Sequence, residues 1–148
     1  MKIGDPDFRT ATEIIIAEEL SGSPLEGQEK SFMEAGQKYN VDPLFLLAIQ
    51  FHESKYCSVY SDQTNSQRHN CAGIMAFDNG KRYIKEYNNY SDFINNHARI
   101  IRTVYFDNGK QTLMDIWSTY APLSEKANGG WGYAVGKKYN EMRARLYS

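Results

Sequence analysis

The 148-residue sequence has no long hydrophobic run and no apolar leader. Its longest apolar stretches, Leu44–Ile49 and Ile14–Ala17, are far shorter than the roughly 20 residues of a membrane-spanning helix, so we expect no membrane insertion. The first residues, MKIGDPDFRTATE, are polar and lack the hydrophobic core of a signal peptide. We therefore expect either a chain made without export or a domain of a larger exported protein.

Neither sign of charge is in excess, because the net charge is −1 and acidic and basic residues are interspersed. Without a basic stripe interleaved with aromatic residues, no nucleic-acid partner is expected. The three histidines, His52, His69 and His97, have none of the spacings of a metal site, and we expect them to be structural. The sequence has no GxSxG motif and no phosphate-binding loop. We expect no metal and no cofactor.

Cysteine is scarce, and its two residues, Cys57 and Cys71, flank a polar loop 14 residues apart. A disulfide across this loop would fit an extracytoplasmic protein, and two half-buried free thiols fit the spacing equally well. Tyrosine is abundant, with eleven Tyr against two Trp, and most of these rings are expected at the boundary between core and surface.

The pattern that is present is mainly helical, in a length that suits one domain. Asp78-Asn79-Gly80-Lys81 predicts a hairpin turn between short strands in Cys71–Phe77 and Arg82–Tyr87. The expected helices are Thr12–Leu20, a helix opened by the capping box Ser23-Pro24-Leu25-Glu26 and ending near Tyr39, Pro43–Ser54, Asp92–Phe106 capped by Ser91, a short helix opened by Thr112-x-x-Asp115, and Tyr133–Leu146.

The most informative residue is Glu53, at the end of an apolar helix. Asp42 suits the N-cap of this helix, and Pro43 suits its first turn. The side chains that follow are apolar on nearly every side, so the helix should be buried and should deliver Glu53 to the edge of the core. Desolvation there favours a carboxyl that is protonated near neutral pH, as a general acid requires. The alternative is that Glu53 only marks where the helix returns to water.

Several segments, in order, resemble the N-acetylglucosaminidase domains of glycoside hydrolase family 73 and, more broadly, lysozyme-like and lytic transglycosylase domains. The resemblance spans about Glu26 to Leu146. Two departures, His69 in place of Asn and Ala72 in place of Phe, alter the expected cleft floor. The matching segments are Tyr39–Pro43, Ala48–Ser54, His69–Ile74, Tyr90–Ile94, Tyr105 with Gly109 and Thr112, and Tyr120-Ala121-Pro122 with Asn128 and Trp131.

The resemblance implies a mainly α, lysozyme-like domain in which a small β-hairpin lobe flanks a glycan-binding groove. Residues 23–148 would form this domain, and residues 1–22 an N-terminal extension with a short helix. The implied activity is cleavage of β-1,4 bonds in peptidoglycan by an endo-β-N-acetylglucosaminidase with Glu53 as general acid. The partner would be peptidoglycan glycan strands. We expect an extracytoplasmic monomer, secreted within a larger protein or carried by a phage.

The resemblance also assigns roles within the cleft. Tyr120 would stabilise oxocarbenium charge or hold the acetamide, and Asn70 would bind the sugar or orient Glu53. Backbone groups of Gly73, Ile74 and Met75 would pair with the glycan. Trp131 would be a stacking platform or a core residue, and Tyr56 and Tyr60 would stack on sugars or lie on exposed loops.

Many members of the family are proposed to use a second carboxylate in the hairpin, where this chain offers only Asp78 and Glu86. Turn chemistry accounts for Asp78, and Glu86 suits a solvated surface position. The alternatives are therefore a two-acid hydrolase and a one-acid enzyme that uses the N-acetyl group of the substrate. A muramidase, or a lytic transglycosylase that yields 1,6-anhydro-MurNAc, is the alternative that cuts the neighbouring bond. An inactive glycan-binding or structural module of a phage or secretion machine is the alternative from another class.

Overall fold

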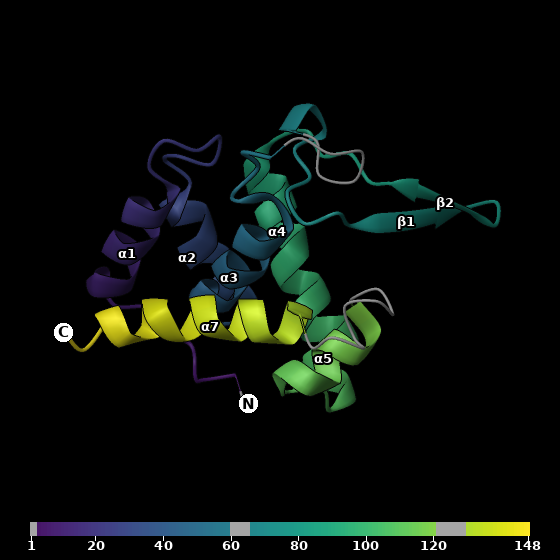
Figure 1. Cartoon of the computed structure of the whole chain (residues 1–148). Helices are drawn as coiled ribbons and strands as arrows, with labels where there is room; N and C mark the ends of the chain where they lie inside the picture. Colours follow the sequence, from purple (N-terminus) through teal and green to yellow (C-terminus); the bar gives the residue numbers. More distant parts are fainter. Residues whose placement is uncertain (1–2, 60–65, 121–129) are drawn as a thin grey trace.

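The computed structural model describes residues 3–59, 66–120 and 130–148, without the side chains of residue 66 and residues 117–120. Its helices pack into one body, and a two-stranded hairpin extends from the side of that body (Figure 1). This confirms the predicted mainly helical fold with a small hairpin lobe. The elements are α1 (Thr10–Leu20), α2 (Glu29–Tyr39), α3 (Pro43–Ser54), η1 (Ser66–Arg68), β1 (Met75–Asp78), β2 (Lys81–Ile84), α4 (Tyr90–Ile100), the π-helical η2 (Ile101–Tyr105), η3 (Phe106–Asn108), α5 (Leu113–Tyr120) and α7 (Gly130–Arg145).

α3 is the central helix of the body. Asp42 caps it as predicted, because its carboxylate accepts a hydrogen bond from the backbone N–H of Leu44 at 3.1 Å, and Pro43 occupies the first turn. Residues 44–49 are all 0% exposed. Each fully buried Leu, Ile or Phe contributes about 1.5–3 kcal/mol. α3 packs chiefly against α7, which crosses in front of it in Figure 1.

The hairpin turns through Asn79 and Gly80, whose φ angles are 51° and 77°. Two positive φ angles in a two-residue loop make a type I′ turn, which Asn-Gly favours, and the predicted turn is confirmed. Each strand is four residues long, and the antiparallel register pairs Met75 with Ile84 at the base of the hairpin. This register places the Met75 side chain on a defined face of the lobe.

The second helix begins at Glu29, so the prediction that Ser23 and Glu26 open it is wrong. Glu26 Oε1 instead accepts a hydrogen bond from the backbone N–H of Gly22, which lies before it, and so closes a turn. Gly27 then takes a φ of +88°, a left-handed conformation that interrupts any right-handed helix. Ser23 and Glu26 therefore belong to the loop before α2 and do not cap the helix.

The helix predicted over Asp92–Phe106 begins at Tyr90, and its N-cap is Asn89 instead of the predicted Ser91. The Asn89 side chain accepts from the backbone N–H of Asp92 at 2.8 Å. A π-helical segment and a 3-10 turn, η2 and η3, replace the last turns of the predicted helix. Such π segments widen the helix locally and often lie beside functional sites.

The last two helices follow the predicted pattern, with one shifted boundary. Thr112 Oγ1 accepts from the backbone N–H of Asp115 at 3.1 Å, and Asp115 Oδ2 accepts from that of Thr112 at 3.4 Å, which confirms the capping box of α5. α7 begins at Gly130, before the predicted Tyr133. The earlier start places Trp131 in the first turn of α7.

The N-terminal segment packs on the rest of the chain. Ile16 and Leu20 of α1 are 0% exposed and belong to the same apolar cluster as α3. Arg145, at the end of α7, pairs with Glu18 at 2.9 Å and with Glu19 at 2.6 Å. Residues 3–22 therefore share the core and an ion-pair network with the remainder. In the described part of the chain, no helix is long and apolar enough to cross a membrane.

Candidate active site

Glu53 lies in the last turn of α3, where the helix leaves the core, and is partly exposed. The indole Nε1–H of Trp131 donates a hydrogen bond to Glu53 Oε1 at 3.0 Å. Trp131 is 0% exposed, so protein covers both faces of its ring and the residue packs in the core. The hydrogen bond thus fixes the glutamate from a rigid position, because a buried indole cannot follow the motion of a surface side chain.

The backbone after Glu53 is held in an unusual turn. Lys55, Tyr56 and Cys57 all have positive φ angles, of 46°, 59° and 68°. Three consecutive left-handed residues without glycine are strained, and such strain persists only where surrounding contacts hold it. The turn fixes the direction in which the chain leaves the candidate acid.

Contacts from Ser54 and a disulfide hold that turn. Ser54 Oγ accepts from the backbone N–H of Cys57 at 2.9 Å and donates to the carbonyl of Cys71 at 2.7 Å. Cys57 and Cys71 form a disulfide, which resolves the alternative that the sequence left open. The end of α3 is therefore tied to the segment that leads into the hairpin.

Asn70 shapes that segment from inside. Its side chain is buried, and its Nδ2 donates to the carbonyls of Ile74 at 2.9 Å and Lys85 at 2.8 Å. Its Oδ1 accepts from the backbone N–H of Ile74 at 3.0 Å. Gly73, inside this loop, has a φ of 65° that few other residues adopt. The Asn70 amide is thus occupied by the backbone of the loop and of β2's continuation.

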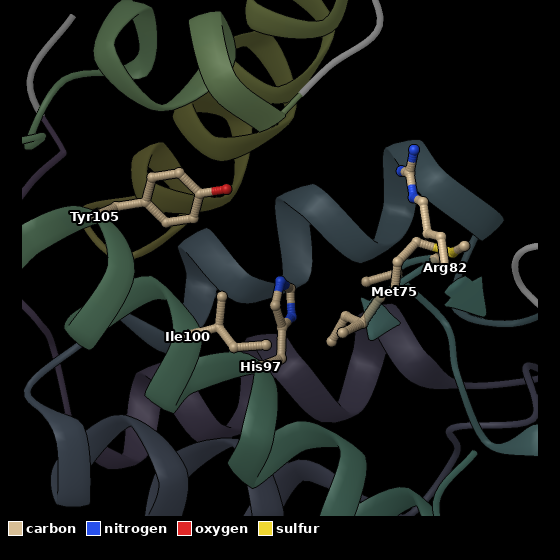
Figure 2. A pocket seen from close by; sticks show the side chains of 8 residues that line it. Met75, Arg82, His97, Ile100 and Tyr105 are labelled. Atoms are coloured by element: carbon tan, nitrogen blue, oxygen red, sulfur yellow. The ribbon is translucent and has the colours of Figure 1, made fainter. Parts of the chain in front are cut away.

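A pocket of about 210 Å³ lies between the base of the hairpin and the α4–η2 helix. Figure 2 shows Met75 and Arg82 of the hairpin on one side, His97 and Ile100 of α4 below, and Tyr105 of η2 opposite. Three of the predicted substrate-binding residues line it. Among the described residues, the lining is formed by Ala72, Gly73, Ile74, Met75, Arg82, His97, Ile100 and Tyr105.

A buried pair lies at the boundary between this pocket and α3. Gln50 Nε2 and His97 Nδ1 are 2.9 Å apart, and both side chains are 0% exposed. Burial lowers the pKa of His97 to about 3, so the imidazole is neutral near neutral pH. Gln50 Oε1 and His97 Nε2 have no hydrogen-bond partner within the described structure. His97 was predicted to be a structural residue, and it is buried beside the pocket.

The two candidates for a second acid are both exposed. Asp78 is the last residue of β1, opposite Lys81 across the turn. The Glu86 side chain is 73% exposed and forms an ion pair with Arg68 at 3.6 Å. Neither carboxyl is enclosed as a buried catalytic base would be. Among the described residues, no group of three or more His, Cys, Asp or Glu is placed to hold a metal ion.

The structure describes the side chain of Tyr56, but not those of the other tyrosines predicted for the cleft. Tyr120 is the last residue of α5, and its side chain lies outside the described residues, as do Tyr60, Pro122 and Asn128. Tyr56 is only 4% exposed and donates to Glu19 Oε2 at 2.7 Å, so its predicted place on an exposed loop is wrong.

Sequence reasoning did not select Gln50, Arg82 or Ile100 for the site. Gln50 is three residues before Glu53, and a single polar side chain inside an otherwise apolar helix was the available signal. Arg82 and Ile100 carry no such signal. They line one pocket because the hairpin and α4, separate in the sequence, lie next to each other in the fold.

The fold is similar to that of solved structures of one bacterial protein. Crystal structures of S. aureus autolysin E superpose on the chain with a TM-score of 0.64 at 20% identity. One holds the muropeptide NAM-L-Ala-D-iGlu, and 99% of this chain covers 72% of it; another, a catalytic mutant with the disaccharide NAG-NAM, is covered to 75%. This similarity confirms the lysozyme-like fold of the predicted family. The chain matches no curated protein sequence.

The family model for mannosyl-glycoprotein endo-beta-N-acetylglucosaminidase matches residues 29–148, which is most of the chain and includes Glu53, the pocket and Trp131. This confirms the resemblance to glycoside hydrolase family 73. The chain therefore belongs to the glucosaminidase family of glycoside hydrolases.

Proposed function

We propose that this protein cleaves β-1,4 bonds in the glycan strands of bacterial peptidoglycan, as an endo-β-N-acetylglucosaminidase with Glu53 as general acid. The observation that carries the proposal is the hydrogen bond from the buried Trp131 indole to Glu53 Oε1, at the edge of the core. Membership of the glucosaminidase family supports the reaction class. The likeness to an autolysin that binds NAG-NAM supports the substrate.

The Trp131 contact assigns the two oxygens of the acid. An indole N–H can only donate, so it pairs with the carbonyl-type oxygen of a protonated carboxyl. With Oε1 accepting from Trp131, the acid proton belongs on Oε2. Oε2 then protonates the glycosidic oxygen as the bond breaks. The resulting carboxylate deprotonates the attacking water and returns Glu53 to its starting state.

We propose that Asp78 and Glu86 take no part in proton transfer. Their exposure to solvent supports this, because a general base gains its reactivity from a shielded position. Gly73, Ile74 and Met75 contact the glycan from the pocket wall. Asn70 shapes this wall, since its amide is hydrogen-bonded to the loop backbone. Tyr120 stabilises the oxocarbenium charge.

Product analysis tests the proposal. Purified cell wall is digested, and the fragments are identified by mass spectrometry. Reducing GlcNAc ends support the glucosaminidase. Reducing MurNAc ends would establish a muramidase, and 1,6-anhydro-MurNAc, which lacks one water, would establish the lytic transglycosylase. An inactive module would release nothing, so wild-type turnover that Glu53→Gln abolishes excludes it.

We further propose that the protein acts outside the cytoplasm as a monomer. The Cys57–Cys71 disulfide supports the location, because disulfides persist in oxidising compartments. Carriage by a phage, or within a larger exported protein, fits such a location. Light scattering at the concentration of the activity assay measures the oligomeric state, and a dimer there would contradict the proposal.

A further inference from the structure

His97 has a ring nitrogen that the fold leaves unused. The side chain is 0% exposed, and its Nε2 has no partner within the described structure. A buried polar atom without a hydrogen bond costs about 1–3 kcal/mol, and native proteins retain few of them. Figure 2 shows the His97 ring projecting from α4 into the pocket, between Ile100 and Met75. His97 therefore lines that pocket, although its Nε2 is itself sealed from solvent.

The neighbouring glutamine determines which proton this atom carries. Gln50 Nε2 is an amide nitrogen, which only donates, so His97 Nδ1 accepts from it across 2.9 Å. A neutral imidazole carries one proton, and with Nδ1 accepting, the proton lies on Nε2. Burial keeps the ring neutral, with a pKa of about 3. His97 therefore presents one N–H donor, and no charge, to the pocket.

This donor lies close to the candidate acid. Gln50 precedes Glu53 by three residues on α3, which is about 4.5 Å along a helix axis. His97 contacts Gln50, so the His97 side chain meets α3 about one helical turn before Glu53. A sugar bound for cleavage at Glu53 has its substituents within reach of this pocket.

The chemistry of the pocket selects among those substituents. Ala72, Ile74, Met75 and Ile100 give the pocket its apolar surface, and His97, Arg82 and Tyr105 give it polar groups. An acetamide group has a methyl that suits such walls and a carbonyl that needs only a donor. A hydroxyl would bring its own proton and has no methyl for the apolar surface. A carboxylate is better matched by the exposed Arg82 than by the neutral, buried His97.

We propose that His97 Nε2–H donates a hydrogen bond to the acetamide carbonyl of an N-acetylated sugar in the substrate, and thereby distinguishes N-acetylated from N-deacetylated glycan. This rests on the proposed function, because it takes peptidoglycan as the substrate. Since Nε2 is sealed in the free protein, the sugar can reach it only if a lining side chain shifts, and the flexible Met75 is suited to do so. His97 is thus a specificity-determining residue.

A binding experiment tests this without catalysis. The Glu53→Gln variant is labelled with ¹⁵N-histidine, and the imidazole signals are assigned with single substitutions of the three histidines. Tri-N-acetylchitotriose is expected to shift the His97 Nε2–H signal downfield, whereas the trimer of glucosamine leaves it unchanged. Equal shifts with both trimers, or none with either, would overturn the proposal.

Two matched variants test the same point by kinetics. In His97→Gln, the amide nitrogen replaces Nε2 as donor, whereas the shorter His97→Asn offers Gln50 a partner but does not reach the pocket. The wild-type and Gln enzymes are expected to favour N-acetylated over deacetylated wall by about tenfold in kcat/KM, the value of one hydrogen bond, and the Asn variant is expected to favour neither. Thermal melting establishes that each variant folds.

The result separates this inference from the proposed function. If the wild type releases GlcNAc ends but the Asn variant still favours N-acetylated wall as strongly, His97 does not determine this specificity and the proposed function stands. If the trimer shifts the His97 signal but no wall is cleaved, the acetamide contact stands and the enzymatic function fails.

Discussion

Trp131 and Glu53, 78 residues apart in the sequence, are joined by a 3.0 Å hydrogen bond between indole Nε1 and carboxyl Oε1. The bond connects the first turn of α7 to the last turn of α3, the two helices that form the main packing contact of the body. A carboxyl at a helix end would otherwise sample several rotamers in water. The buried indole selects one of them.

Glu53→Gln is expected to lower cell-wall cleavage by a factor on the order of 10²–10⁴, because the amide cannot donate the acid proton. Release of reducing sugar from purified wall measures the effect, and circular dichroism checks the fold. Glu86→Gln is the matched control, since its carboxyl is exposed and ion-paired to Arg68, and it should keep nearly full activity. If Glu86→Gln lost as much activity as Glu53→Gln, the one-acid assignment would be wrong.

Trp131→Phe retains most of the buried volume and removes only the N–H donor. We expect kcat to fall about 10–100-fold, the cost of a hydrogen bond to a charged group, while KM changes little. The pH profile of kcat should also move, because the partner of the acid has changed. A purely structural role would reduce the melting temperature and leave that profile where it was.

Asp42 and Asn89 are both N-caps, but only Asp42 is buried in a network. Its Oδ2 accepts from Tyr139 and from Arg143, each at 2.6 Å. Asp42→Ala should cost about 3–5 kcal/mol, because it leaves a partly buried cation unpaired. Asn89→Ala removes only a cap at an exposed helix end and should cost about 1 kcal/mol. Urea titrations compare the two; equal losses would mean that the network adds nothing.

Glu19 should make stability fall in acid. Burial raises its pKa, but the hydrogen bonds from Tyr56, Lys138 and Arg145, together with the charge of Lys138, outweigh burial and hold the pKa below the ordinary 4.5. A carboxyl with a lowered folded-state pKa stabilises the fold above pH 4.5, and this contribution is lost as pH falls through the folded-state value. Melting temperatures from pH 6 down to about pH 3 should therefore fall less steeply in Glu19→Gln. Glu18→Gln, at an exposed ion pair, should follow the wild-type curve.

Reduction of the Cys57–Cys71 disulfide should both destabilise the protein and slow catalysis. Closing a loop of 14 residues contributes about 3 kcal/mol. The same bond helps to hold the left-handed turn after Glu53, so activity should fall at temperatures where the reduced protein is still folded. Melting and wall cleavage with and without dithiothreitol measure both effects. The Cys57→Ser, Cys71→Ser double variant should not respond to the reductant, and an unchanged wild type would contradict this account.

Local sequence signals predicted the elements whose hydrogen bonds are local. The Asp42-Pro43 cap of α3, the Asn79-Gly80 turn and the capping box at Thr112 all form as expected. The predicted start of the second helix was wrong, because the same side chains can cap a helix or close a turn. Ser23 and Glu26 close a turn, and the left-handed φ of Gly27 delays the helix.

The sequence by itself determined that Glu53 stands at the edge of the core, because an apolar stretch behind a strong cap has to be buried up to its first polar residues. Only the tertiary structure decided what surrounds Glu53. The Trp131 indole meets Glu53 across 78 residues, and Gln50 meets His97 across 47 residues. Such pairings depend on how α3, α4 and α7 pack together, and no spacing within one helix encodes that packing.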